Sequence, residues 1–230
     1  MTIEIRALND KKRPILYIST TAVDLRAALE EAVAAHHWVS GADLHGADLS
    51  GGHFNDAFDL TDCDFSGANC EGADFSNSNL SRGIFKLVRF QGAKFNRTYL
   101  DDTDMSQLDF SGSDWSGAHL KRVDFRESFF TDARFVKTEG FDCDFRFADL
   151  TRADFREAGF NKPYFCDANL DQTNFTKTSF YEAIFRNTDL RTAIFAATYF
   201  YRGDFERAQI NRQDPELMKS LLASLGIGEG

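Results

Sequence analysis

The sequence predicts an all-β solenoid, a chain wound into stacked square coils, and a five-residue hydrophobic period is the first of three observations behind this prediction. A large apolar residue recurs every five residues from Leu60 to Ile210 and, before one inserted residue near Ala57, from Leu44 to Phe54. Twenty of these 34 central positions are Phe and nine are Leu. Because an α-helix repeats every 3.6 residues and a strand every two, neither element explains this period.

Small side chains at a fixed place in the period are the second observation. The residue two positions before a central residue is usually small, as at Ala68, Ala73, Ala148 and Ala153. One large and one small residue in every five indicate two inward positions and three outward ones, so the chain turns a corner every five residues. Four such sides close one coil, and residues 20 apart should then stack at about 4.8 Å, the spacing of β-strands.

Charges that alternate every 20 residues are the third observation. The residues two positions after every fourth central residue alternate in sign: Asp62, Arg82, Asp102, Arg122, Asp142, Lys162, Glu182 and Arg202. A second column, one position before a central residue, does the same: Asp74, Lys94, Asp114, Arg134 and Asp154. Opposite charges on adjacent strands stabilise a sheet by roughly 0.2–1 kcal/mol per pair. These columns therefore favour coils of 20 residues.

Residues 1–37 are predicted to form a cap over the first coil, because an open coil edge invites edge-to-edge association. The segments TIEIRAL and PILYIST alternate in polarity around NDKK and predict a β-hairpin. Thr21 and Asp24 then predict a capping box for a helix over AVDLRAALEEAVAA. Its apolar face, expected to pack on the first coil, carries Leu25, Leu29 and Val33.

Residues 213–230 are predicted to form a short C-terminal helix and a tail. Asp214 and Pro215 indicate the helix start and Gly226 its end. The apolar stripe of this helix comprises Leu217, Leu221, Leu222 and Leu225. It either caps the last coil or forms a dimer contact, which an aromatic patch of Tyr181, Tyr199 and Tyr201 on the last coils would complete in either case.

Two positions depart from the pattern. Gly140 removes a central side chain, so a local kink or bulge is expected there, with the neighbouring Phe141 either turned inward or exposed. The inserted residue near Ala57 predicts a small bulge on one edge of the coil.

The tandem pattern Ala-(Asp/Asn)-(Leu/Phe)-x-x, as in ADLHG, ADFSN, ADLTR and ADFRE, resembles that of the pentapeptide-repeat proteins over about residues 38–212. The resemblance implies a right-handed quadrilateral β-helix of eight to nine coils with the central Leu and Phe side chains stacked inside. The C-terminal helix resembles the dimerising tail of the quinolone-resistance subgroup. Members of that subgroup bind DNA gyrase and topoisomerase IV as DNA mimics and protect them from antibiotics.

The charge distribution leaves two functions open. The net charge of -10 disfavours direct binding of nucleic acid, which needs clustered Lys and Arg. Residues 41–120 hold 13 acidic and 5 basic residues, whereas residues 121–212 hold 15 of each. The candidates for an acidic partner-binding face are therefore Asp62, Asp64, Asp74, Asp101, Asp102, Asp104, Asp109 and Asp114. The alternating columns place cations among these anions, so a scaffold or adaptor for another protein is the alternative.

Catalytic chemistry is not predicted. The five histidines fall on different faces or several coils apart, the four cysteines show no C-x-x-C pairing, and the closing GIGEG follows a helix instead of joining a strand to one. We therefore expect no enzyme, metal or cofactor. The N-terminus has no apolar run of the kind that a signal peptide or membrane span needs, and we expect a cytoplasmic protein.

Overall fold

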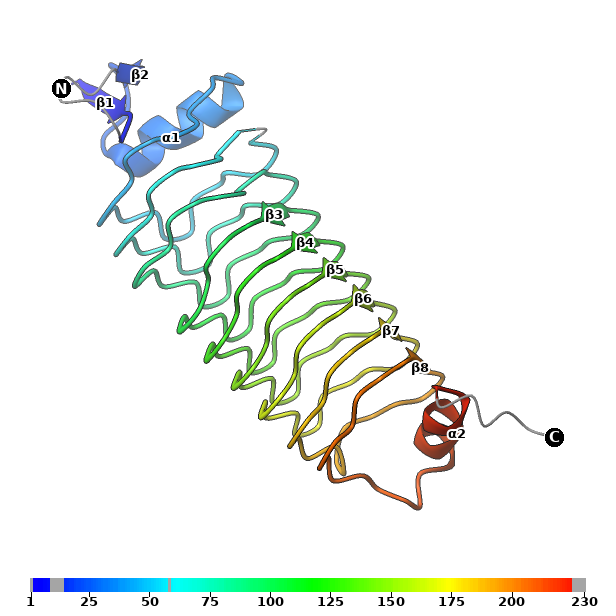
Figure 1. The fold of residues 1–230 in the computed structure, drawn as a ribbon. Coiled ribbons are helices and arrows are strands. Elements are labelled where there is room, and N and C mark those ends of the chain that lie inside the picture. The colour runs from blue at the N-terminus through cyan, green and yellow to red at the C-terminus, as the bar shows by residue number, and fades with distance from the viewer. Residues whose placement is uncertain (1, 9–14, 58, 225–230) are drawn as a thin grey trace.

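The computed structural model describes residues 2–8, 15–57 and 59–224 and shows a long β-helix with a cap at each end (Figure 1). The strands β1 (Ile3–Arg6) and β2 (Ile15–Ser19) and the helix α1 (Leu25–Ala34) lie at one end. The helix α2 (Pro215–Ser224) lies at the other end. Within the described ranges, neither helix is long and apolar enough to cross a membrane.

Six short strands from successive coils form one parallel sheet along the β-helix. They are β3 (Tyr99–Asp101), β4 (His119–Lys121), β5 (Glu139–Phe141), β6 (Gly159–Asn161), β7 (Ser179–Tyr181) and β8 (Tyr199–Tyr201). Each residue pairs with the residue 20 positions later, as Leu100 does with Leu120. On the other three sides, single bridges such as Asp104 to Asp124 keep the same spacing. The predicted 20-residue coil is confirmed.

The number of coils depends on what is counted. The named strands record six successive coils, fewer than the eight to nine expected. Backbone hydrogen bonds between coils extend further in both directions. They run from the Gly41 N–H, which donates to the Thr61 carbonyl at 2.8 Å, to the Leu190 N–H, which donates to the Gln209 carbonyl at 2.8 Å.

The core is a stack of aromatic rings, because the central residues of successive coils lie directly above one another. Phe110 lies parallel to Phe90 and to Phe130, with ring centroids 5.3 and 5.0 Å away. Within a coil, neighbouring rings such as Phe125 and Phe130 meet edge to face at 84°. Both arrangements suit the ring quadrupole and add to the gain from burial.

The small residues two positions before the centres are also inward, as predicted, and Ser or Thr at this position is hydrogen-bonded. The Thr98 hydroxyl donates to the Phe75 carbonyl at 2.9 Å, and the Thr138 hydroxyl donates to the Trp115 carbonyl at 2.8 Å. Each bond joins one coil to the preceding coil, 23 residues back. A buried hydroxyl is therefore satisfied where Ala would otherwise stand.

The corner two positions after a centre places the backbone in the left-handed region in nearly every repeat, with Thr192 as an exception. Residues there have φ between 52° and 70°, from Gly46 in the first coil to Arg207 in the last. Glycine adopts this conformation freely, whereas other residues are strained in it. The five-residue turn thus has a backbone requirement that the hydrophobic period does not reveal.

The predicted insertion is confirmed by a change of register. The bridges Asp43 to Asp64 and His53 to Asp74 join residues 21 apart, whereas Asp64 and Ile84, one coil later, are 20 apart. The additional residue therefore lies between His53 and Leu60, next to Asp56, whose φ is 62°.

The predicted irregularity at Gly140 is wrong. Strand β5 pairs in register with both neighbours, and Gly140 lies opposite Leu120 and Phe160. A Cβ on Gly140 would come within 2.1 Å of the Phe160 ring, so this ring occupies the space that a central side chain would take. The core therefore stays filled without a bulge, and Phe141 remains outside, 42% exposed.

The N-terminal cap contains the predicted hairpin and helix, with a different N-cap. Strand β1 pairs with β2 antiparallel and continues onto the first coil, where the Asp43 N–H donates to the Arg6 carbonyl at 2.7 Å. Asp24, not Thr21, caps α1 by accepting the Ala27 N–H at 2.8 Å. Thr21 instead donates to Glu31, because it lies outside the helix. Leu29 and Val33 are buried and Leu25 is partly buried.

Helix α2 caps the last coil. Asp214 accepts the N–H groups of Glu216 and Leu217 at 3.0 and 3.1 Å, as expected at a helix start. Leu217 and Leu221 are buried in the core, whereas Leu222 is 41% exposed. Leu225 and Gly226 lie outside the described residues. Of the two alternatives for the apolar stripe, Leu217 and Leu221 therefore serve the cap.

Candidate protein-binding surface

Each coil has four outward faces, which we name by their central residues. The strand face carries the sheet β3–β8 and is centred on residues such as Leu100 and Leu120. The second, third and fourth faces follow in chain order and are centred on Phe125, Phe130 and Phe135 in one coil and on the equivalent residues elsewhere.

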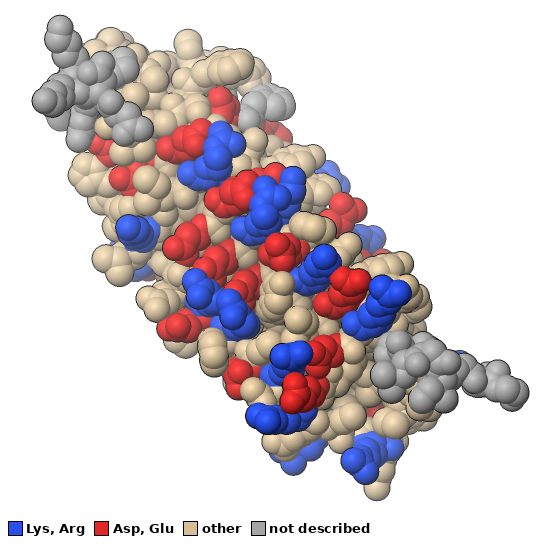
Figure 2. Space-filling view, viewed as in Figure 1, with Lys and Arg blue, Asp and Glu red and all other residues tan. Residues whose placement is uncertain are grey.

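The structure does not bring the eight acidic candidates onto one face. Asp62, Asp101 and Asp102 belong to the strand face, Asp64 and Asp104 to the second, Asp109 to the third, and Asp74 and Asp114 to the fourth. Figure 2 shows Lys and Arg side chains beside Asp and Glu along the visible face. An unbroken acidic face is therefore absent from the described part of the chain.

Five of these carboxylates hold turns of the coil. Each accepts the backbone N–H of the residue two positions later, at 2.8 to 3.0 Å: Asp64 from Ser66, Asp74 from Ser76, Asp104 from Ser106, Asp109 from Ser111 and Asp114 from Ser116. This is an Asx turn, which needs an acceptor oxygen but no charge. The amides of Asn79 and Asn174 make the same bond at 3.1 and 3.0 Å. The alternation of Asp and Asn in the repeat was the sequence signal for this role.

Two further acidic candidates are ion-paired with the next coil. Arg82 donates to both carboxylate oxygens of Asp62 at 2.8 and 2.7 Å, and Arg122 donates to Asp102 in the same way, with its Nη2 at 2.6 Å. These hydrogen bonds lower the pKa of both carboxyl groups. The predicted alternation thus gives ion pairs between some of the coils, including those of Glu182 with Lys162 and Arg202, each at 3.8 Å. In the second column, Asp74 and Lys94 are the one ion pair among the described residues, at 3.4 Å.

Aromatic side chains gather on the strand face, and the sequence had pointed only to the three tyrosines at its C-terminal end. Tyr99 stacks on His119 with ring centroids 4.7 Å apart and an angle of 9° between the planes. His119 in turn lies 3.2 Å from Glu139. Phe141 and the three predicted tyrosines are exposed further along the same face. The available signal was the aromatic residues immediately beside central positions, where most coils carry polar residues.

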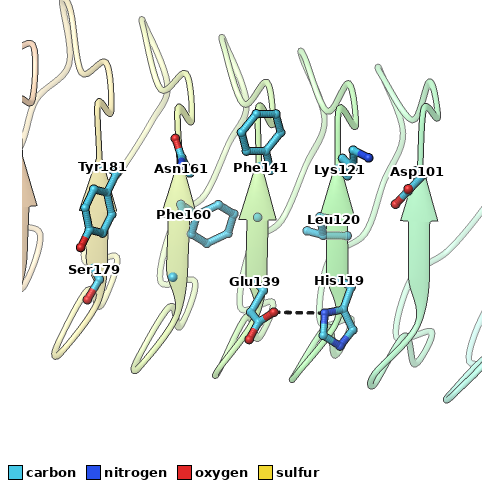
Figure 3. A pocket seen from close by; sticks show the side chains of 12 residues that line it. Asp101, His119, Leu120, Lys121, Glu139, Phe141, Phe160, Asn161, Ser179 and Tyr181 are labelled. Carbon is cyan, nitrogen blue, oxygen red and sulfur yellow. Dashed lines mark ion pairs between the residues drawn. The ribbon is translucent and has the colours of Figure 1, made fainter.

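A shallow pocket of about 430 Å³ lies in this face around Gly140 and Gly159. The strands carry two rows of outward side chains, and Figure 3 shows Lys121, Phe141 and Tyr181 in one row and His119 in the other. Gly159 interrupts the second row, and at Gly140 the Phe160 ring leans across from the neighbouring strand. The pocket thus lies where Gly159 has no side chain in the outward row, beside the Phe160 ring that fills the central position of Gly140.

The three tyrosines Tyr181, Tyr199 and Tyr201 lie together at the end of the strand face. The Tyr181 ring lies 6.0 Å from Tyr199 and 5.6 Å from Tyr201, and the Arg202 guanidinium lies over the Tyr201 ring at 5.0 Å. Strand β8, which carries two of these tyrosines, packs against α2. The patch, Ile194 and Leu222 are therefore exposed apolar groups at this end of the described chain.

The groups that could carry chemistry are dispersed. Among the described residues, no three His, Cys, Asp or Glu side chains form a group that could hold a metal ion. Three of the four free cysteines are buried, and burial raises the pKa of the Cys63 and Cys143 thiols to about 12. These thiols belong to the core.

Comparison with known families agrees with this geometry. The profile of the pentapeptide repeat region matches residues 58–135, and the profile of pentapeptide repeats in eight copies matches residues 164–196. The chain is a pentapeptide-repeat protein. No curated protein matches its sequence.

Two solved structures illustrate the likeness of this pentapeptide-repeat protein to others. QnrB1, a plasmid-mediated fluoroquinolone resistance protein, is 15% identical over 72% of this chain and 89% of its own, with a TM-score of 0.50. HetL, which takes part in regulating heterocyst differentiation in the cyanobacterium Nostoc sp. strain PCC 7120, is 20% identical over 79% of this chain and 91% of its own, with a TM-score of 0.44. At these identities, the likeness to QnrB1 concerns the fold.

Proposed function

We propose that this pentapeptide-repeat protein is a non-catalytic protein-binding module whose main docking surface is the strand face. The concentration of exposed aromatic side chains there carries the proposal: Tyr99, Phe141, Tyr181, Tyr199 and Tyr201 are all at least 40% exposed. Aromatic residues supply large contact areas at low entropic cost and are enriched at the centres of protein interfaces. The pocket at Gly140 is a place where an aromatic side chain, or another side chain of the partner, can insert.

Photocrosslinking tests this proposal. A photoreactive benzoylphenylalanine in place of Phe141 should capture a protein from cells of the source organism. The matched control carries the same group in place of Phe147, which is more exposed but stands at a corner after the second face. Equal capture from both positions would count against the strand face as the docking surface.

Topoisomerase binding is the second candidate, favoured by the excess of acidic residues in residues 41–120 and by the fold shared with QnrB1. In this version the rod competes with DNA for DNA gyrase or topoisomerase IV and modulates inhibition by antibiotics. Purified protein, titrated into gyrase supercoiling and quinolone-induced cleavage assays, should inhibit or rescue the enzyme at micromolar concentration. Neither effect at that concentration would remove this candidate and leave the general binding module standing.

A homodimer is a narrower proposal, in which Leu222 and the tyrosine patch supply the contact that the buried Leu217 and Leu221 do not. The variant Leu222→Asp with Tyr201→Asp should halve the mass measured by light scattering. A monomeric wild-type protein would refute the dimer. We further propose that the module acts in the cytoplasm, where its four unpaired cysteines would stay reduced.

A further inference from the structure

A second pocket, of about 420 Å³, lies where α1 meets the first coils. Its lining includes Val33, His37, Trp38, Asp56, Asp59 and Asn79. Asn79 bridges to Tyr99, so the pocket adjoins the N-terminal end of the strand face. It differs from every other part of the β-helix because it combines the cap with the coil that carries the inserted residue.

Two irregular backbone features create this pocket. His36 ends α1 with φ at 55°, and the N–H groups of His36 and His37 donate to the Val33 and Ala32 carbonyls, each at 2.9 Å. The chain therefore reverses and leaves Trp38 80% exposed, while the next residue is buried. Asp56 and Asp59, the carboxylates of the lining, belong to the part of the coil where the register changes by one residue. Bulges of this kind are over-represented beside binding sites.

The carboxylates of the pocket are held by neutral groups. Asp56 accepts from the side-chain amides of Asn55 and Asn77, each at 3.0 Å, and Asp59 accepts from the Thr61 hydroxyl at 2.5 Å. Residues 41–81 contain eight Asp or Glu and no Lys or Arg.

Arg82, the first Lys or Arg after residues 41–81, is already ion-paired with Asp62. Both Nε and Nη2 of Arg82 are hydrogen-bonded to Asp62. Elsewhere in the coils, by contrast, carboxylates such as those of Asp102 and Asp132 pair with an arginine of the next coil. Among the described residues, no Lys or Arg forms an ion pair with Asp56 or Asp59, so both carboxylates can accept from a cationic group of a partner.

We propose that this pocket binds an arginine or lysine side chain of the protein partner. The exposed indole of Trp38 offers the aromatic face that attracts cations most strongly, and Asp56 and Asp59 supply charge-assisted acceptors. This inference rests on the proposed function and deepens it. A partner lying along the strand face would place one basic side chain at the N-terminal end of its footprint, which fixes the position of the partner along the rod.

Tryptophan fluorescence provides a direct test, since the chain has only two tryptophans. Trp115 is buried between Phe95 and Phe135, so Trp115→Phe restores the commonest core residue and leaves Trp38 as the only reporter. Titration with the peptide acetyl-Gly-Ser-Arg-Ser-Gly-amide should change the Trp38 emission saturably. The same peptide with citrulline, which is neutral and nearly isosteric with arginine, should not.

The carboxylates are tested by the double variant Asp56→Asn with Asp59→Asn, which should weaken the arginine response about threefold to tenfold. Asp167→Asn is the matched control, because Asp167 has φ at 57° and accepts from the Asn187 amide at 3.4 Å, much as Asp56 accepts from Asn77. This control should leave the response unchanged.

Three results would overturn the assignment. They are an equal response to citrulline, an equal effect of Asp167→Asn, and tighter binding of free arginine than of the arginine peptide, which would indicate a small-molecule site. Failure of the crosslinking at Phe141, with a normal arginine response, would instead count against the strand face alone.

Discussion

The two halves of the β-helix share one core but differ in the residues that occupy the corners of their coils. Between residues 41 and 120, eight of the sixteen residues with positive φ are glycine. Between residues 121 and 212, none of the seventeen is glycine. The first half has a net charge of -8 from 13 acidic and 5 basic residues, and the second is neutral with 15 of each.

The difference shows what a strained corner can provide. Each non-glycine corner in the second half costs backbone energy, but many of its side chains reach the next coil. Arg152 pairs with Asp132 at 2.7 Å and Lys137 with Glu157 at 3.7 Å, and all four residues have positive φ. Glycine corners in the first half avoid the strain, and among the described residues more carboxylates of this half have no Lys or Arg partner. The core thus fixes the fold, whereas the corners decide how much charge is left for a partner.

The largest expected effect concerns the shared core. Phe90→Ala in the first half and Phe130→Ala in the second should each lower the free energy of unfolding by about 3–5 kcal/mol. Both rings are fully buried on the third face, on either side of Phe110. Denaturant unfolding measures both losses. A gap of several kcal/mol between them would show that the two halves do not share an equivalent core.

The corners should respond in opposite directions. Gly112→Ala forces a Cβ onto a backbone with φ at 68°, whereas Ala197→Gly removes one from φ at 55°. The strain of about 1–2 kcal/mol exceeds the change of about 0.4–1 kcal/mol in unfolded-chain entropy. We therefore expect Gly112→Ala to lower and Ala197→Gly to raise the unfolding free energy by about 0.5–1 kcal/mol. A Cβ on Gly112 would meet no atom within 4 Å, so a steric clash cannot explain a loss.

Substitutions of an Asx-turn aspartate can distinguish its structural role as a hydrogen-bond acceptor from the role of its charge. Asp104→Ala removes the acceptor for the Ser106 N–H and should cost about 0.5–1.5 kcal/mol. Asp104→Asn keeps an acceptor, as Asn79 does, and should leave stability nearly unchanged. If Asp104→Asn also leaves gyrase inhibition intact, its charge is not part of an acidic docking face. Equal destabilisation by both substitutions would contradict the turn role.

The smallest effect concerns an ion pair between corner residues of neighbouring coils, Arg152 and Asp132. Hydrogen bonds from Arg152 lower the pKa of Asp132 in the folded protein. Because the folded pKa is depressed, the stabilisation is present above the unfolded pKa of about 3.9 and is lost as pH falls through the folded value.

Arg152→Gln should accordingly lower the urea midpoint at pH 7, and this difference should disappear in strong acid. Arg97→Gln is the control, since Arg97 also occupies a positive-φ corner but has no ion pair among the described residues. A difference that is independent of pH would rule out the Arg152–Asp132 pair as its source.

Sequence alone was sufficient for the repeat, the caps and some of the ion pairs between coils, because each depends on residues at fixed spacing. It could not foresee that the Phe160 ring would fill the space at Gly140, since that depends on side-chain packing between coils. It also treated Asp64 and Asp104 as surface charge, because net charge does not distinguish a turn acceptor from a free carboxylate. The Trp38 pocket depends on how the cap meets the inserted residue, which no periodicity encodes.

The caps described above also fix the length of the β-helix. Strand β1 closes the first coil and α2 closes the last, so the number of coils between them is set by the chain and not by polymerisation. Each deletion of one 20-residue unit, such as residues 121–140, would bring the Trp38 pocket and the tyrosine patch closer by one strand spacing, about 4.8 Å. The distance between these two proposed docking points is thus set by the number of 20-residue coils between them.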